Sequence, residues 1–498
     1  MSSKPYRYTL NFALALTLAP LIQISPAAAD WSALHALQAK RGVHVTAAAV
    51  DLASGKTLQA LNPEQRLTPA SLSKIVLAGA AFDNWPGDKT FATRVISERA
   101  ARGDKLDGDL IVYSEGDATL DHQSLWFLAA QVRQTGIRKV KGGLIVKAAP
   151  FGALDCETKD RCEAQARSHT AYDAPLAAFG VDYGTWCVDI TPSQAGDVAQ
   201  VQSCAAVDVP IPLEGEIQTR QGRPRTWMWL DRITRGEDEA LVMDGDISAK
   251  GSGQRLYRSM TNPSLGAGML LKQILGEVGV DVEGDVRVDN GAVPQDVQVL
   301  ASIDSKPLNE QVASLLRYSN NYITDVLTLA LAASRTPKPA GSLAEASRPL
   351  EDFILRAREG MGYPAPRDAD DRPRMLSGSG LTPESKLSAQ DLVAVLTAEY
   401  RDTQRFPLFY AGLVVPAQAP HAYLRHGNRD WKDRVSFKTG TLSEPHSAFG
   451  IAGYMRRKDG GWIAFTALVN GASARKSISM RESLDAIRKD VEDLLKRY

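Results

Sequence analysis

The chemistry of the chain begins with Ser71-Leu72-Ser73-Lys74, which sets a hydroxyl and an amine three residues apart. On a helix, residues i and i+3 lie on one face, so the Lys74 amine would lie one turn from the Ser71 hydroxyl. A neutral amine there can accept the hydroxyl proton and activate the serine as a nucleophile. Ser71 would also stand in the first helical turn, whose unpaired backbone N–H groups can stabilise an oxyanion. Taken alone, such a serine is more often an ordinary residue at a helix start.

A second pattern, Ser319-Asn320-Asn321, precedes a segment that we expect to be helical. A hydroxyl and an amide two residues apart can face one cleft. Ser319 would then pass a proton to a leaving amine, and Asn321 would hold a substrate carbonyl or the lysine. The alternative is a helix N-cap, which is the more common role of serine and asparagine at such positions.

The third pattern, Lys438-Thr439-Gly440-Thr441, ends a predicted strand. The Lys438 ammonium and the Thr439 hydroxyl can bind a substrate carboxylate through a charge-assisted contact. Gly440 lets a substrate backbone approach the strand edge closely, and the N–H of Thr441 can supply a second oxyanion donor. A plain strand end followed by a turn is the alternative.

The three patterns are far more informative together. Their order matches the S-x-x-K, S-x-N and K-T-G set of β-lactamases and penicillin-binding proteins. The chain holds another S-x-x-K, Ser473-Ala474-Arg475-Lys476. That copy follows the other two patterns, so its order is wrong and we regard the match as accidental.

The elements that must position these groups lie towards the two ends of the chain. Between about 91 and 305 the sequence pattern changes and predicts short β segments with Gly-Asp turns. Hydrophobic periodicity predicts helices and strands around each pattern and an amphipathic helix at the C-terminus. The expected ranges are 43–50 and 57–61 (hairpin), 71–82 (helix), 125–135 and 266–278 (helices of the middle region), 307–331 (helical), 435–438, 448–456 and 462–469 (strands) and 476–497 (helix).

Composition restricts the class of protein. The chain has 498 residues, 44% of them apolar, with 58 basic and 58 acidic side chains. This balance excludes a disordered chain and argues against a nucleic-acid binder. Lys4 and Arg7, an apolar stretch over 10–22 and the small residues ending at Ala29 form a secretory signal peptide, 1–29. No later segment can span a bilayer, so we expect a soluble exported protein; an uncleaved N-terminal anchor is the alternative.

The four cysteines lie between 156 and 204. An even number in an exported chain indicates disulfides, and the pairs Cys156–Cys162 and Cys187–Cys204 would close the shortest loops. A zinc site is the competing interpretation, although the spacings do not resemble paired C-x2-C ligands.

With these motifs, the chain resembles the class C penicillin-binding proteins of the PBP4 type, peptidase family S13. The resemblance spans nearly the whole mature chain. Ser319 lies 248 positions after Ser71, which fits a family that nests two extra domains between its first two motifs. The segments that carry it are 69–74, 106–110, 115–120, 173–176 and 378–381.

The resemblance implies a fold and an activity. The fold is α/β (α+β) and penicillin-binding/β-lactamase-like, with a five-stranded antiparallel sheet flanked by helices. The activity is that of a periplasmic D-Ala-D-Ala carboxypeptidase/endopeptidase, which acts on peptidoglycan stem peptides without metal or cofactor and is inhibited by β-lactams. The expected domains are a peptidase domain (30–90 and 306–498), an inserted domain II (91–147 and 249–305) and a nested, mainly-β domain III with the four cysteines (148–248).

The resemblance also assigns roles. The nucleophile attacks the carbonyl of a D-Ala-D-Ala or D-Ala-diamino acid bond, with the neighbouring lysine as general base. The expected catalytic residues are Ser71, Lys74, Ser319, Asn321 and Lys438; the expected substrate-binding residues are Thr439, Gly440, Thr441 and Lys147, and no metal is expected.

Three positions depart from the family pattern. Asn320 replaces the aspartate of S-D-N, and Ser377 replaces the aspartate of D-G-S-G-L. Lys147 stands four residues before Phe151, where the family has an aspartate that meets the amino group of the stem-peptide diamino acid. The like charge of Lys147 would disfavour a free cationic diamino end.

A serine β-lactamase and a non-catalytic peptidoglycan-binding protein share parts of this pattern. No glutamate motif suited to deacylation follows S-x-N, and a β-lactamase leaves the inserted region unexplained. A pure binder has no need for Ser71, Lys74 and Lys438 together. The ratio of carboxypeptidase to endopeptidase activity, the oligomeric state and membrane association stay open.

Overall fold

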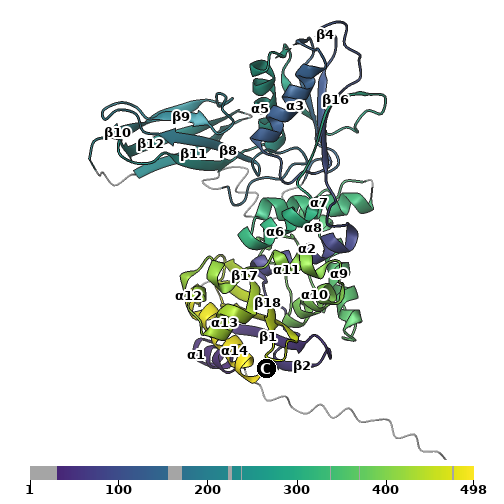
Figure 1. Cartoon of the computed structure of the whole chain (residues 1–498), viewed down its shortest axis with the longest axis vertical. Helices are drawn as coiled ribbons and strands as arrows, with labels where there is room; N and C mark the ends of the chain where they lie inside the picture. Colours follow the sequence, from purple (N-terminus) through teal and green to yellow (C-terminus); the bar gives the residue numbers. More distant parts are fainter. Residues whose placement is uncertain are drawn as a thin grey trace, which may run out of the picture.

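A computed structural model describes residues 31–154, 171–222, 227–236, 238–336, 338–369, 371–473 and 476–498 (Figure 1). The predicted signal peptide, 1–29, and the predicted Cys156–Cys162 pair lie outside the described residues. The two ends of the described chain together form the lower body in Figure 1, and the middle of the sequence forms the upper part.

The lower body is built on a five-stranded antiparallel sheet with the strand order β17-β18-β19-β1-β2. The N-terminal hairpin pairs with the last strand of the chain, so that Ala47 lies opposite Ala467. The predicted five-stranded sheet is therefore confirmed. Its strands are β1 His44–Asp51, β2 Thr57–Leu61, β17 Val435–Leu442, β18 Ala448–Arg456 and β19 Trp462–Asn470.

Helices cover both faces of this sheet, because its strands carry apolar residues on both sides. On β18, Ala452 and Tyr454 pack into the core that contains α2, α7 and α10, whereas Ile451 and Met455 face α1 and α14. The helices are α1 Ser32–Arg41, the 3₁₀ turn η1 Ala70–Leu72, α2 Ser73–Asn84, α6 Leu308–Tyr318, α7 Asn321–Arg335, α8 Leu343–Ala346, α9 Arg348–Gly360, α10 Ala389–Arg401, α11 Phe406–Ala411, the 3₁₀ turn η2 Pro416–Gln418, α12 Ala422–Arg425, α13 Arg429–Arg434 and α14 Met480–Arg497.

Helix α14 is the predicted C-terminal amphipathic helix, and it begins four residues later than expected because the Ser479 side chain caps it at Glu482 N. Its Asp490 carboxylate accepts hydrogen bonds from the backbone N–H groups of Ala33 and Leu34, at the start of α1. The two ends of the described chain are thereby joined. Within the described ranges, neither α14 nor any other helix combines the length and apolar character needed to cross a bilayer.

The upper part contains a second five-stranded sheet, with the order β15-β7-β5-β3-β16, on which α3 and α5 pack. Its strands come from two stretches of the chain on either side of a further insertion. The elements are β3 Ala92–Ser97, β4 Lys105–Leu106, β5 Leu110–Ser114, α3 His122–Gln134, β6 Lys139–Val140, β7 Leu144–Lys147, α5 Pro263–Glu277, β14 Asp281–Val282, β15 Val286–Asp289 and β16 Gln298–Asp304.

The further insertion forms two three-stranded sheets, β10-β12-β11 and β13-β8-β9. The predicted disulfide Cys187–Cys204 is present and links β8 to the residue that follows β9. Since β13 pairs with β8, the pairing favours a boundary of this insertion after Ser259 rather than after residue 248. The strands are β8 Thr185–Thr191, β9 Gln200–Ser203, β10 Leu213–Arg220, β11 Trp227–Arg235, β12 Asp238–Ser248 and β13 Gln254–Ser259.

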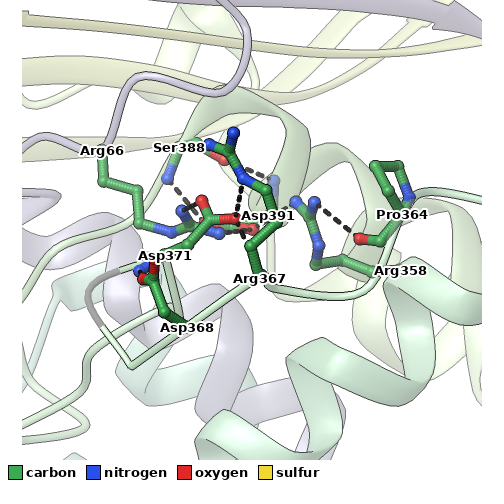
Figure 2. Close-up of polar contacts among 8 residues, drawn as sticks. All are labelled: Arg66, Arg358, Pro364, Arg367, Asp368, Asp371, Ser388 and Asp391. Carbon is green, nitrogen blue, oxygen red and sulfur yellow. Dashed lines mark hydrogen bonds and ion pairs between the residues drawn. The ribbon is translucent and has the colours of Figure 1, made fainter.

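A buried ion-pair network anchors the segment that leads into the first motif (Figure 2). The Asp391 carboxylate, near the start of α10, accepts hydrogen bonds from Arg66 Nε at 3.2 Å and from Arg358 Nη1 at 2.6 Å. It also accepts from the backbone N–H of Ser388 at 2.8 Å, which completes a capping box at α10. Arg66 pairs in addition with Asp371. Because Arg66 lies just ahead of the first motif, the network fixes the path of the chain into the site.

Candidate active site

The first motif forms a tight turn ahead of α2 rather than one continuous helix. Residues Ala70–Leu72 form the 3₁₀ turn η1, and the α-helix begins at Ser73, two residues later than predicted. Ala70 has a left-handed φ of 47°, which is uncommon for a residue with a side chain and marks a constrained backbone. Ser71 follows directly and is 7% exposed.

Two glycines from other motifs pack against this turn. A Cβ atom on Gly380 would lie 1.9 Å from the carbonyl oxygen of Ala70, and one on Gly440 would lie 2.7 Å from that of Pro69. A side chain at either position would push the turn out of place. The structure thus gives Gly440 a packing role that the sequence did not indicate, while its role towards substrate remains a prediction.

Lys74 is fully buried in the first turn of α2, beside Ser71. Its Nζ lies 3.0 Å from Ser71 Oγ, 2.8 Å from Asn321 Oδ1 and 2.7 Å from the carbonyl oxygen of Ser379. The motif therefore places the amine within hydrogen-bond distance of the hydroxyl. The sequence indicates Asn321 as a partner of the lysine, but the contribution of Ser379 is a backbone oxygen, which no side-chain pattern reveals.

The second motif lies in the junction between α6 and α7. Ser319 follows α6 with a left-handed φ of 58°, and Asn321 is the first residue of α7. The side chain of Asn320, between them, caps α7, so the capping role falls to the middle residue. The Asn321 Nδ2 group donates to the carbonyl oxygen of Tyr172 at 3.1 Å, which orients the amide so that its oxygen faces Lys74.

Lys438 is buried on β17, opposite this junction. Its Nζ lies 2.9 Å from Ser319 Oγ and 2.8 Å from the carbonyl oxygen of Thr439. Burial lowers the pKa of Lys438 to about 7, because the ammonium loses its hydration. The site therefore contains two hydroxyl–amine pairs, Ser71 with Lys74 and Ser319 with Lys438.

Strand β17 continues through the third motif, which therefore lies inside the strand and not at its end as predicted. Phe437 exchanges backbone hydrogen bonds with Val414 at the outer edge of the sheet. Backbone groups alternate in direction along an antiparallel strand, so the N–H of Thr441, four residues on, also points to this edge. Strand β17 is an edge strand of the sheet and contacts η1, the turn that carries Ser71, while the role of Thr441 as an oxyanion donor stays a prediction.

The structure places Lys147 apart from these contacts, at the end of β7 in the upper sheet. Its Nζ pairs with Asp289 Oδ2 on the neighbouring strand β15 at 2.5 Å. Phe151, the residue on which the alignment of Lys147 rests, is buried in the core and lies close to Gly116, where an added Cβ atom would be 2.8 Å from the Phe151 ring. The other predicted site residues converge around the two hydroxyl–amine pairs, and a role for Lys147 towards substrate stays a prediction.

A comparison with protein families decides the classification. The model described as the D-Ala-D-Ala carboxypeptidase 3 (S13) family matches residues 27–491. The chain belongs to this S13 family. The match spans all three motifs and the inserted region, so the resemblance inferred from the sequence is confirmed and the protein is a peptidase of the D-Ala-D-Ala carboxypeptidase type.

Named relatives of this S13 protein include two carboxypeptidases. The D-alanyl-D-alanine carboxypeptidase of Actinomadura sp. (strain R39) is 27% identical over 451 residues, which cover 87% of this chain and 79% of the relative. The D-alanyl-D-alanine carboxypeptidase DacB of Haemophilus influenzae is 24% identical over 429 residues, covering 81% and 80%.

A solved structure shows the same fold. Penicillin-binding protein 4 (dacB) from Haemophilus influenzae superimposes with a TM-score of 0.74 at 21% identity, covering 93% of this S13 chain and 99% of that one. The same protein complexed with a β-lactam gives a TM-score of 0.70 at 20% identity, with the same coverage. The predicted penicillin-binding fold is confirmed.

Proposed function

We propose that this S13-family protein is a periplasmic serine DD-peptidase of peptidoglycan. It removes the terminal D-Ala of stem peptides and cleaves D-Ala-diamino acid crosslinks through an acyl-enzyme on Ser71. The family assignment supports the carboxypeptidase activity, and the predicted signal peptide supports export.

The observation that carries the proposal is the set of oxygens around Lys74 Nζ. The side-chain oxygen of Asn321 and the carbonyl oxygen of Ser379 can only accept hydrogen bonds. A neutral amine has two N–H groups and one lone pair. When the two N–H groups donate to these oxygens, the lone pair is directed towards Ser71 Oγ, 3.0 Å away, which carries a proton. Lys74 is therefore placed to act as the general base.

Acylation follows from this arrangement. Ser71 Oγ attacks the scissile carbonyl carbon while its proton passes to Lys74. The oxyanion that forms accepts hydrogen bonds from the backbone N–H groups of Ser71 and Thr441. Collapse of this intermediate breaks the C–N bond, and the proton that Lys74 accepted passes through Ser319 Oγ to the leaving amine, which leaves Lys74 neutral again. An ester of Ser71 remains.

The Lys438 ammonium and the Thr439 hydroxyl hold the carboxylate of the leaving residue, next to Ser319. Water then attacks the ester, again with Lys74 as proton acceptor, which releases the shortened peptide and restores Ser71. A penicillin carries a carboxylate and a reactive amide in the same relation as the substrate. It acylates Ser71 in the same way and inhibits the enzyme.

Labelling with a fluorescent penicillin tests this proposal. We expect one covalent label, located on Ser71 by peptide mass spectrometry, and no label in Ser71→Ala. Ser473→Ala is the matched control and should label as the wild type does. Label that persists in Ser71→Ala, or that maps to Ser473, would contradict the assignment.

Purified muropeptides test the substrate. We expect pentapeptide monomers to lose D-Ala and crosslinked dimers to give monomers, and both reactions should stop in Ser71→Ala. Rapid turnover of a chromogenic cephalosporin, without action on muropeptides, would identify a β-lactamase instead.

A further inference from the structure

We propose that Asp325 is a positioning residue for the general base, which acts through the backbone of Ser379. This inference rests on the proposed function, because it assigns Asp325 to the acylation step. Asp325 lies on α7, one helical turn after Asn321, and its carboxyl group is fully buried. Residues i and i+4 share a helix face, so α7 presents both side chains to the same region.

The contacts form a short chain that ends at the nucleophile. Asp325 Oδ1 accepts a hydrogen bond from the backbone N–H of Ser379 at 2.8 Å. The carbonyl oxygen of Ser379 accepts from Lys74 Nζ at 2.7 Å, and Lys74 contacts Ser71. Helix α7 therefore holds the lysine twice, directly through Asn321 and indirectly through Asp325.

The turn that contains Ser379 is confined by its glycines. A Cβ atom on Gly378 would lie 2.2 Å from Thr328 Oγ1 on α7, and one on Gly380 would lie 1.9 Å from the carbonyl oxygen of Ala70. These close contacts hold the turn in place between α7 and η1, the turn that carries Ser71. A buried N–H requires an acceptor, and the Asp325 carboxylate supplies a charge-assisted one.

The consequence concerns acylation rather than recognition. If the Ser379 carbonyl turns away, the amine of Lys74 loses one of the acceptors that direct its lone pair to Ser71. The contacts of Lys438 with Ser319 and with the Thr439 carbonyl are separate from this chain. Removal of the Asp325 carboxylate should therefore slow the covalent step and leave the initial binding of the substrate carboxylate unchanged.

Penicillin acylation kinetics in Asp325→Ala and Asp325→Asn test the inference, since they separate the initial dissociation constant from the acylation rate constant. For Asp325→Ala we expect a rate constant about 30-fold lower, a part of the roughly 10²–10⁴-fold that a positioned base contributes, and a dissociation constant within about threefold of wild type. Asp325→Asn keeps an oxygen for the Ser379 N–H, so its rate constant should lie within about fivefold of wild type.

Thr328→Val is the matched control, because Thr328 packs against the same turn from the next turn of α7. It should acylate within about threefold of wild type. A wild-type rate constant in folded Asp325→Ala overturns the inference. A folded Asp325→Asn variant that is as slow as the alanine variant also overturns it, and so does a Thr328→Val variant that is equally slow. If the alanine variant does not fold, the acylation rate constant of Asp325→Asn is compared with that of the wild type, and a value well outside about fivefold overturns the inference. If wild-type Ser71 is not acylated, the proposed function itself has failed, which is a separate result.

Discussion

The Nζ atom of Lys438 lies 2.9 Å from Ser319 Oγ, and this contact joins the edge strand of the sheet to the junction between two helices. Ser319 and Lys438 form a hydroxyl–amine pair, as Ser71 and Lys74 do. Burial lowers the pKa of Lys438 to about 7, so its charge changes close to neutral pH.

The first prediction concerns this charge. A lowered pKa means that Lys438 is an ammonium below about pH 7 and increasingly neutral above it. Only the ammonium binds a carboxylate strongly, so we expect kcat/KM for a peptide with a free C-terminus to fall up to about tenfold per pH unit on the alkaline side. Lys438→Arg keeps its charge at all these pH values and should lose this alkaline limb. A peptide with a C-terminal amide is the control; an equal limb with that peptide would contradict the role.

The second prediction concerns the proposed general base, Lys74. Lys74→Arg keeps a cation but cannot release its proton, so penicillin acylation should fall to below about 1% of wild type. Lys476→Arg is the matched control from the out-of-order motif, where Ser473 and Lys476 form an isolated β-bridge rather than a helical turn. It should acylate normally. An arginine variant at position 74 that retains more than a few per cent of the rate would contradict the base role.

The third prediction concerns the network around Asp391 (Figure 2). Asp391→Ala leaves the buried guanidinium of Arg358 without this carboxylate, which should lower the free energy of unfolding by about 3–5 kcal/mol. Asp371→Ala removes a half-buried partner of Arg66 and should lower the free energy of unfolding much less, because an ion pair near the surface contributes little. Denaturant unfolding of the three proteins provides the comparison, and equal midpoints for the two variants would show that the buried pair does not stabilise the fold.

The sequence predicts the site well where local geometry decides it. The i, i+3 spacing sets Ser71 beside Lys74, and alternating apolar strands at the two ends of the chain predict the sheet that carries Lys438. The order of the motifs predicts that the remaining residues join the same site, because the family fold pairs strands from the two ends of the chain in one sheet. Short sequence patterns are therefore enough to predict that these residues lie in one site.

Other features depend on groups that a residue pattern does not show. The Ser379 and Tyr172 carbonyls are backbone oxygens, and their direction is set only when distant segments pack. In the sequence, Gly440 suggests space for a substrate backbone. In the structure, the absence of a Cβ atom at Gly440 leaves space for the carbonyl oxygen of Pro69. The partner of Lys147 is Asp289, which lies 142 positions away and becomes a neighbour only through the pairing of β7 with β15.

The fourth prediction follows from that pair. The Asp289 carboxylate offsets the charge of Lys147, so Asp289→Asn should expose any repulsion of a cationic diamino end. We expect kcat/KM for a peptide with a free diamino group to fall about three- to tenfold, and that for the N-acylated peptide to change little. Lys147→Met should raise the first value or leave it unchanged. Equal responses of both peptides would place Lys147 outside substrate recognition.

The last prediction concerns Glu399, which lies on α10. Its carboxyl group is fully buried, neither oxygen has a hydrogen-bond partner among the described residues, and Arg405 Nη1 is 3.8 Å away. Burial raises the pKa of Glu399 to about 8, against the opposing effect of Arg405. Asp117 and Asp490 are also buried carboxyl groups whose pKa values burial raises, each to about 6.

A raised pKa in the folded state means that the native protein holds a proton which the unfolded chain has lost. The stabilisation is complete below the unfolded pKa of about 4.3 and disappears as the pH rises through about 8, at up to about 1.4 kcal/mol per pH unit. Asp117 and Asp490 act in the same direction but only up to about pH 6. In Glu399→Gln, the stability contributed by Asp117 and Asp490 should be lost up to about pH 6 as in the wild type. The decline in stability between about pH 6 and 8 comes from Glu399 and should therefore be flatter in the variant. Thermal denaturation of both proteins at half-unit pH steps measures this difference, and parallel curves through that window would mean that Glu399 is ionised in the native state.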